Sequence, residues 1–182
     1  MYEVEVKVRA DHDAVRTRLD ELGVTRERRV EQVDTYYDAP DRDFAATDEA
    51  LRIRRETRHD TDDATSTTRL TYKGPLVDED SKTREEHETP VPEGETMAAI
   101  LDGLGYTPAA TVEKVRDYYT LDGDTVVLDT VTDLGTFVEV ERESEDIDTA
   151  REAVFARLRQ LGLDPDDQIR TSYLALLHDS SQ

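Results

Sequence analysis

The sequence predicts an α+β fold in which eight antiparallel strands close into a barrel and helices flank it. Segments that alternate apolar and charged residues recur along the chain, as in strands with one apolar face. Short connections join most of these segments, which is typical of antiparallel neighbours. Long antiparallel strands in such number tend to close on themselves, because closure removes exposed strand edges.

The first half of the chain supplies five of the expected strands. They cover residues 2–9, 24–37, 50–58, 67–73 and 82–91. Asp11 can cap a helix that runs through Leu22, with Gly23 after its end. The segment 38–41 reads as a turn, the acidic segment 60–63 as a loop, and the Gly74-Pro75 pair ends a strand.

The second half supplies three more strands, at 112–121, 125–131 and 136–143, with a turn at Asp122-Gly123-Asp124. A helix is expected at 97–104, ended by Gly105. Asp148 can cap another helix, whose apolar residues recur at helical spacing up to Gly162. A short helix follows at 171–177. We expect one domain over 1–178 and a frayed tail at 179–182.

Composition excludes several classes of protein. The chain of 182 residues has no cysteine, which excludes disulfide scaffolds, thiolate zinc sites and cysteine nucleophiles. No apolar run is long enough for a membrane span, and polar alternation directly after Met1 leaves no room for a signal peptide, so we expect a cytoplasmic protein. A net charge of −21 argues against binding to nucleic acids or anionic membranes.

Other catalytic chemistries find little support. The four histidines, at positions 12, 59, 87 and 178, are dispersed without metal-ligand spacing, so we expect them on the surface. No Gly-x-Ser-x-Gly, Walker A or GxGxxG motif is present. Phosphate binding would therefore rest on side chains and metal.

The alternating strands allow two arrangements. Their charged faces can look at water, as in an ordinary sheet, or line a wide barrel whose apolar outer face is covered by helices. The signs of the charges favour the barrel, because cations gather on the proposed inner face of a very acidic chain. They are Lys7, Arg9, Arg52, Arg54, Lys73, Lys82, Arg84, Lys114 and Arg116. All four lysines of the chain are among them, which points to a use for compact ammonium groups.

Carboxylates alternate with these cations. Glu3 with Glu5, and Glu139 with Glu141, stand two residues apart, so the members of each pair share a face, and Asp129 stands in the strand before the second pair. Paired carboxylates suit a hard divalent cation. Cations and metal carboxylates around one cavity are what a polyphosphate needs. Exposed cross-strand ion pairs, each worth about 0–1 kcal/mol, are the alternative interpretation.

The pattern also resembles a known family. The chain begins with EVEVK (3–7) and continues in order through DTYYD (34–38), ALRIR (50–54), LTYKGP (70–75), KTREE (82–86), EKVR (113–116), LD (128–129) and FVEVE (137–141). The first segment fits the ExExK signature of the CYTH superfamily, the triphosphate tunnel enzymes, and the ordered series is similar to that family over nearly the whole chain.

The resemblance implies a tunnel that holds a triphosphate with Mg²⁺ or Mn²⁺. Carried over by position, the metal ligands would be Glu3, Glu5, Asp129, Glu139 and Glu141. The phosphate-binding residues would be Lys7, Arg52, Arg54, Lys73, Lys82, Arg84, Lys114 and Arg116. The catalytic group would be Glu3, Glu5, Lys7, Lys114 and Arg116. On this basis we expect Glu5→Gln or Arg54→Ala to abolish turnover without unfolding the chain.

The residues of these segments resemble those of the class IV adenylate cyclase branch, which implies conversion of ATP to cyclic AMP and pyrophosphate. A triphosphatase acting on tripolyphosphate, thiamine triphosphate or a nucleoside triphosphate stays open, as does a non-catalytic polyphosphate or nucleotide sensor. The expected partner is a small-molecule triphosphate. The family analogy also suggests a homodimer.

The acidic excess predicts a dependence on salt. Like charges on the surface repel one another unless ions screen them, which suggests a cytoplasm of high ionic strength. We expect the chain to melt at a lower temperature when the KCl concentration is below roughly 0.1 M, because the Debye length then exceeds about 10 Å. Thermal melts across a KCl series check this expectation. A melting temperature indifferent to KCl would contradict it.

Overall fold

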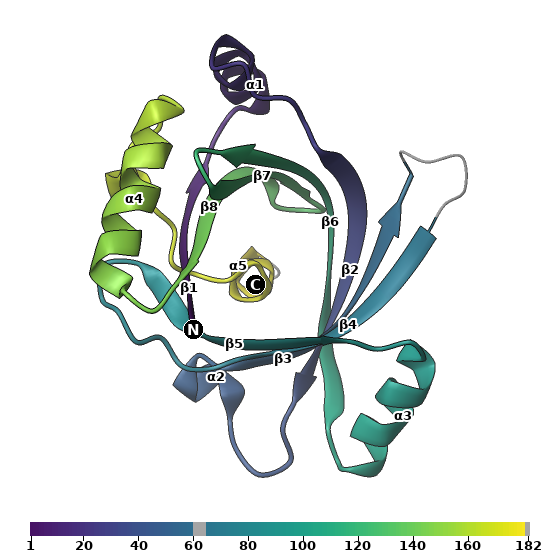
Figure 1. The fold of residues 1–182 in the computed structure, drawn as a ribbon. Helices are drawn as coiled ribbons and strands as arrows, with labels where there is room; N and C mark the ends of the chain where they lie inside the picture. Colours follow the sequence, from purple (N-terminus) through teal and green to yellow (C-terminus); the bar gives the residue numbers. More distant parts are fainter. Residues whose placement is uncertain (60–64, 181–182) are drawn as a thin grey trace.

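The computed structural model describes residues 1–59 and 65–180, and these form a closed antiparallel barrel of eight strands (Figure 1). The strands are β1 (Tyr2–Arg9), β2 (Arg28–Asp38), β3 (Ala50–Arg58), β4 (Thr65–Lys73), β5 (Lys82–Pro90), β6 (Thr107–Leu121), β7 (Asp124–Val131) and β8 (Gly135–Ser144). Around the barrel they follow the order β1-β5-β4-β3-β2-β6-β7-β8. The predicted closed barrel is confirmed, while the expected loop at 60–63 lies outside the described residues.

The helical elements are α1 (His12–Glu21), α2 (Phe44–Thr47), α3 (Gly94–Gly103), α4 (Ile147–Gln160), a 3₁₀ turn (Pro165–Asp167) and α5 (Tyr173–Ser180). Helices α1 and α4 pack outside the barrel against β8, and α4 also contacts β1. Helix α5 lies inside the ring of strands (Figure 1). Among the described helices, none is long and apolar enough to cross a membrane.

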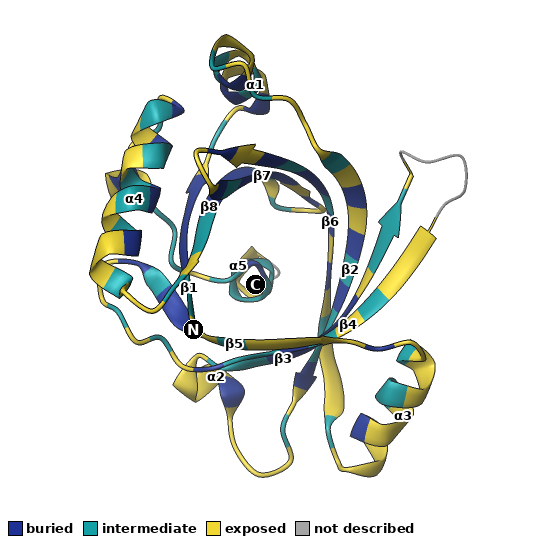
Figure 2. Cartoon of the chain, viewed as in Figure 1, coloured by how far each residue is buried: buried dark blue, intermediate teal, exposed yellow. Residues whose placement is uncertain are grey.

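The main apolar core lies outside the barrel wall. Val4, Val6 and Val8 of β1 are buried there, in one cluster with Leu19 of α1 and Leu158 of α4. Figure 2 shows these contact faces as buried positions on both helices and the wall. The alternate residues of β1 therefore face the interior. Of the two arrangements that alternation allows, the chain adopts the one in which the charges point inward.

Strand boundaries differ from the expected ones at β2 and β6. Strand β2 begins at Arg28, because the Val24 N–H donates to the Leu19 carbonyl at 2.9 Å and completes the end of α1. Strand β6 begins at Thr107 because β2 keeps pairing with it beyond an irregularity at Tyr36 and Tyr37. The short α2 and the 3₁₀ turn were not expected.

The cap of α4 also differs. Asp146, rather than Asp148, caps this helix, and its carboxylate accepts the Thr149 N–H at 3.1 Å. Asp148 lies in the first turn, where its carboxylate accepts a hydrogen bond from Arg151 at 2.9 Å. Both acids suit a helix N-terminus, so sequence alone cannot separate the cap from the first turn.

Two side chains lie elsewhere than expected. His12 is buried, not on the surface, and its Nε2 hydrogen-bonds the Phe137 carbonyl at 2.9 Å. The other three histidines are exposed, as expected. Arg9 lies outside the charged interior, because its guanidinium donates to the Leu134 carbonyl at 2.8 Å at the end of the barrel.

One end of the barrel interior is apolar. Val112, Val131 and Phe137 from the wall meet Tyr173 of α5 there, and all four are buried. The Tyr173 ring packs edge-on against Phe137, with 5.0 Å between the ring centroids. This end of the barrel is therefore filled by side chains, and the charged stretch of the interior begins next to it.

A buried ion pair joins the neighbouring strands β2 and β3 on the inner face of the barrel wall. Arg54 donates to both oxygens of Asp34, at 2.6 and 2.7 Å, and both side chains are buried. Burial alone would raise the pKa of Asp34, but the Arg54 and Arg52 guanidiniums hold it well below its ordinary value. The Asp34 carboxylate therefore stays charged, with Arg54 as its bidentate partner and Arg52 as a second cation at 3.6 Å.

This pair changes the expectation for Arg54→Ala. Removing one partner of a buried pair leaves an uncompensated charge, which costs about 3–5 kcal/mol, so this variant should lose that much free energy of unfolding. Urea titration measures it, with Glu145→Gln, at an exposed position, as the control whose stability should stay within about 1 kcal/mol of the parent. An unchanged unfolding midpoint in Arg54→Ala would show that the pair contributes little.

Candidate functional site

The barrel interior holds a cavity of about 1440 Å³ that is lined largely by charged side chains. All but one of the predicted site residues line it: Glu3, Glu5, Lys7, Arg52, Arg54, Lys73, Lys82, Arg84, Lys114, Arg116, Glu139 and Glu141. They reach it because alternate residues of each strand point to the same face. The exception is Asp129, which is fully buried and held by Arg116.

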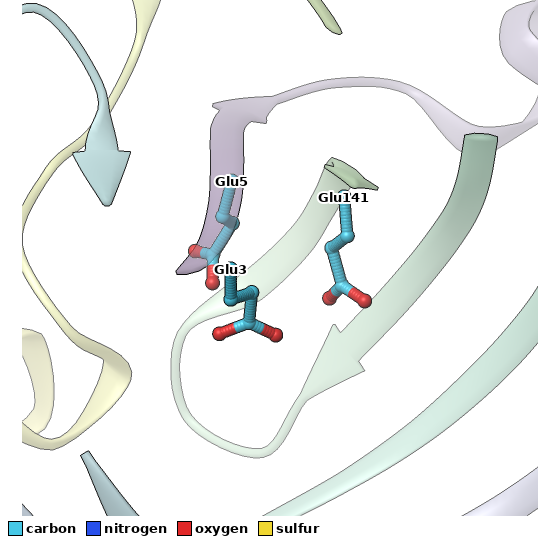
Figure 3. Close-up of side chains that lie close together, drawn as sticks. All are labelled: Glu3, Glu5 and Glu141. Carbon is cyan, nitrogen blue, oxygen red and sulfur yellow. The ribbon is translucent and has the colours of Figure 1, made fainter. Parts of the chain in front are cut away.

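Three carboxylates converge in this cavity. Glu3 and Glu5 of β1 and Glu141 of β8 each offer an oxygen within 4.8 Å of the others. Figure 3 shows the three side chains directed from two neighbouring strands toward a common space. The register produces this convergence, because Glu5 stands opposite Glu141 and Glu3 shares the face of Glu5. Oxygen donors of this kind suit Mg²⁺ or Mn²⁺.

The electrostatics of the three carboxylates also fit a cation. Burial, together with the charges of Glu3, Glu139 and Glu5, raises the pKa of Glu141 to about 8 against the opposing effect of Arg116. Crowded carboxylates repel one another, so one of them holds its proton. A divalent cation among them would remove that repulsion.

The two other carboxylates expected as metal ligands surround a guanidinium. Arg116 donates to both oxygens of Asp129, at 2.7 and 2.6 Å, and to Glu139 at 2.6 Å. The same guanidinium reaches Glu141 at 3.3 Å. The structure therefore brings Glu3, Glu5 and Glu141 together as a possible metal site, and it places Asp129 and Glu139 around Arg116.

Cations lie directly beside these carboxylates. Lys73 contacts Glu3 at 2.8 Å and Glu86 at 2.7 Å, and Lys82 contacts Glu5 at 3.2 Å. Lys7 Nζ and Arg52 Nε are buried, and within the described ranges 1–59 and 65–180 neither atom has a hydrogen-bond partner. These two cations therefore keep donors free for a ligand.

The buried lysines crowd one another. Burial lowers the pKa of Lys7 to about 7, with the charge of Lys82 as the next cause. Burial likewise lowers the pKa of Lys114 to about 8, helped by the neighbouring charge of Arg116. A polyanion in the cavity would favour the charged form of both lysines.

Arg84 differs from the other predicted phosphate-binding residues. It donates to the Asp48 carbonyl at 2.7 Å, to the Asp48 carboxylate at 3.0 Å and to the Gly74 carbonyl at 3.2 Å. Asp48 ends α2 in the left-handed conformation, with φ of 56°. Arg84 thus spends most of its donors on fastening this turn to the barrel.

Several residues of the interior were not among the predicted ones. Arg28, Gln32 and Asp34 share one face of β2, so the alternation that identified the other strands could have indicated them. The Arg28 guanidinium stacks 3.7 Å above the ring centroid of Tyr118. Tyr173 had no such signal, because it reaches the interior from a helix.

The arrangement suits chemistry on a phosphate chain. Ammonium and guanidinium groups can neutralise phosphate oxygens, and metal-binding carboxylates stand beside them. Phosphoryl transfer needs mainly positioning and charge neutralisation, which rigid strands with fixed inward side chains can supply.

We expect the three carboxylates to bind one Mn²⁺ ion, and Glu141→Gln to weaken that binding about tenfold or more, because it removes a charged ligand. Electron paramagnetic resonance titration with Mn²⁺ measures the affinity. Glu145→Gln is the matched control, since Glu145 is exposed beyond the end of β8. Equal Mn²⁺ affinity in the parent and in Glu141→Gln would exclude this site.

Comparison with known proteins gives the family. The model of the CYTH domain matches residues 1–173. The Methanocaldococcus jannaschii protein named "Putative adenylate cyclase MJ0240" is 38% identical over 97% of this chain and 98% of its own length. The solved structure of PH1819 protein from Pyrococcus horikoshii OT3 is also 38% identical, with a TM-score of 0.87 over 97% of this chain and 98% of that one.

A more distant structure shows the same fold. The Hippeastrum protein named "Putative adenylyl cyclase HpAC1", which is described as having a dominant triphosphatase activity, is 18% identical. Its TM-score is 0.68, over 98% of this chain and 95% of that one. With a domain match that spans nearly the whole barrel and a relative of 38% identity along its full length, this chain belongs to the CYTH family.

Proposed function

We propose that this chain is a divalent-metal-dependent enzyme that holds a triphosphate inside its barrel and converts ATP to cyclic AMP and pyrophosphate. One observation supports this most: Glu3, Glu5 and Glu141 converge in the same cavity as buried cations that have donors to spare. A site built only for stability would pair such groups with one another.

The basic residues would bind and orient the phosphate chain. Lys7 Nζ and Arg52 Nε can donate to phosphate oxygens, because neither atom would have to break an existing hydrogen bond. Lys73 and Lys82 already lie against Glu3 and Glu5, so they would contact phosphates next to the metal carboxylates. Their places on the barrel wall fix the line along which the phosphates lie.

A Mg²⁺ or Mn²⁺ ion held by Glu3, Glu5 and Glu141 would draw charge from the phosphate oxygens as the leaving group departs. In the cyclase reaction, the ribose 3′-hydroxyl oxygen forms a bond to the α-phosphorus and loses its proton. The bond from the α-phosphorus to the bridging oxygen breaks, and pyrophosphate leaves. The protein holds these atoms in line and neutralises the charge.

The size of the cavity supports a substrate with an organic part. At about 1440 Å³ it exceeds the range of about 300–1,000 Å³ that is usual for small-molecule sites, so it has room beyond a triphosphate chain. Tyr36, Phe44 and Pro108 line part of it and could contact an organic group such as a nucleoside.

Hydrolysis of a triphosphate is the second candidate. The free donors of Lys7 and Arg52 are cationic groups that would contact phosphates, and they need no nucleoside to be satisfied. With water as the nucleophile, the same arrangement would release the terminal phosphate of the substrate as orthophosphate.

The test offers ATP, tripolyphosphate and thiamine triphosphate in parallel to the purified chain, in high KCl with Mg²⁺ or Mn²⁺. Cyclic AMP from ATP is the expected product, and orthophosphate from all three would identify a triphosphatase instead. Glu5→Gln should lower turnover about 100-fold or more, whereas Glu145→Gln should leave it unchanged. Binding of these triphosphates without turnover would identify the chain as a triphosphate sensor instead of an enzyme.

A further inference from the structure

Tyr173 reaches the charged interior from α5 instead of from a strand. It is the first residue of this helix, it is buried, and it lines the cavity. Its ring lies below two ammonium groups: Lys7 Nζ is 4.3 Å from the ring centroid and Lys114 Nζ is 5.0 Å from it. One aromatic ring thus contacts two cations from different strands.

An aromatic ring supports a cation in a way that a carboxylate does not. Its π face attracts the ammonium charge but accepts no full hydrogen bond, so the N–H donors stay available. Lys7 shows this state, because its buried Nζ has no hydrogen-bond partner among residues 1–59 and 65–180. A carboxylate in the same place would neutralise the lysine and use its donors.

The ring is fixed by contacts at its hydroxyl and its edge. The Tyr173 hydroxyl donates to Asp129 Oδ2 at 3.0 Å, and Asp129 is itself held by Arg116. Phe137 packs against the ring with an angle of 65° between the two planes. The ring therefore presents its face to the lysines in one orientation.

We propose that Tyr173 is a positioning residue that holds the ammonium groups of Lys7 and Lys114 together, with the donors of Lys7 free for the end of the phosphate chain next to α5. The inference rests on the proposed function, since it concerns how the same cavity binds a triphosphate. It gives α5 a role in binding the substrate, whereas the motifs found in the sequence lie on the strands.

The test measures tripolyphosphate binding by isothermal titration calorimetry, in high KCl with EDTA, so that metal binding does not contribute. Tyr173→Leu removes the ring and should weaken binding about tenfold. Tyr173→Phe keeps the ring and should bind within about twofold of the parent. Leu176→Ala, which loosens α5 at a side chain outside the cavity, is the matched control and should bind like the parent.

The outcomes separate this inference from the proposed function. A parent chain that binds no tripolyphosphate, either in EDTA or with added Mg²⁺, would overturn both, and one that binds it only with Mg²⁺ would overturn only the role of Tyr173. A parent that binds, together with Tyr173→Leu of equal affinity, would overturn only the role of Tyr173. If Tyr173→Leu does not fold, Tyr173→Phe still decides, because a tenfold loss in that variant would show that the ring is not what positions the lysines. If Leu176→Ala loses as much tripolyphosphate affinity as Tyr173→Leu, the role of Tyr173 would also be overturned.

Discussion

The structure depends on enclosing many charges in a closed barrel whose main apolar core lies outside the wall. Because strand residues alternate, the valines of β1 that pack against α1 and α4 force Glu3, Glu5 and Lys7 inward. Buried charges are expensive, and well-packed apolar residues in their place are often neutral or stabilising. The charged interior is therefore not explained by stability, and a ligand that needs those charges is the better explanation.

The interior charges form two groups with different roles. Arg54 with Asp34, and Arg116 with Asp129, are bidentate pairs in which both partners use their main hydrogen-bonding atoms. In the second group like charges lie close together: the pKa of Glu141 is raised, and the pKa values of Lys7 and Lys114 are lowered, so burial and like charges favour the neutral forms of these three residues. The first group holds the wall in register. The second group gains from a metal ion and a polyanion, which is how an empty site favours its ligands.

Sequence reasoning predicted the faces of the strands better than the partners of the side chains. Alternation is a local property, so it placed Glu3, Lys73 and Lys114 in the interior. It could not show that Arg84 is used to fasten Asp48, or that Asp129 is held by Arg116, because those partners come from distant segments. It also missed the place of α5 in the interior, since a short amphipathic helix packs equally well on either side of a wall. Helix caps were ambiguous wherever two acids stood close together.

Salt screens the charges on the outer surface of the barrel more strongly than the charges in its interior, so its main effect is on the approach of a ligand to the site. The acidic surface gives the chain a net charge of −21, which repels an approaching triphosphate over distances that ions readily screen. The interior pairs are enclosed by the barrel wall, where screening is much weaker. Salt should thus remove the repulsion at the entrance while leaving the attraction at the binding groups largely intact. Cations enclosed inside an acidic shell are therefore compatible with binding a polyanion at an ionic strength that would weaken an exposed basic site.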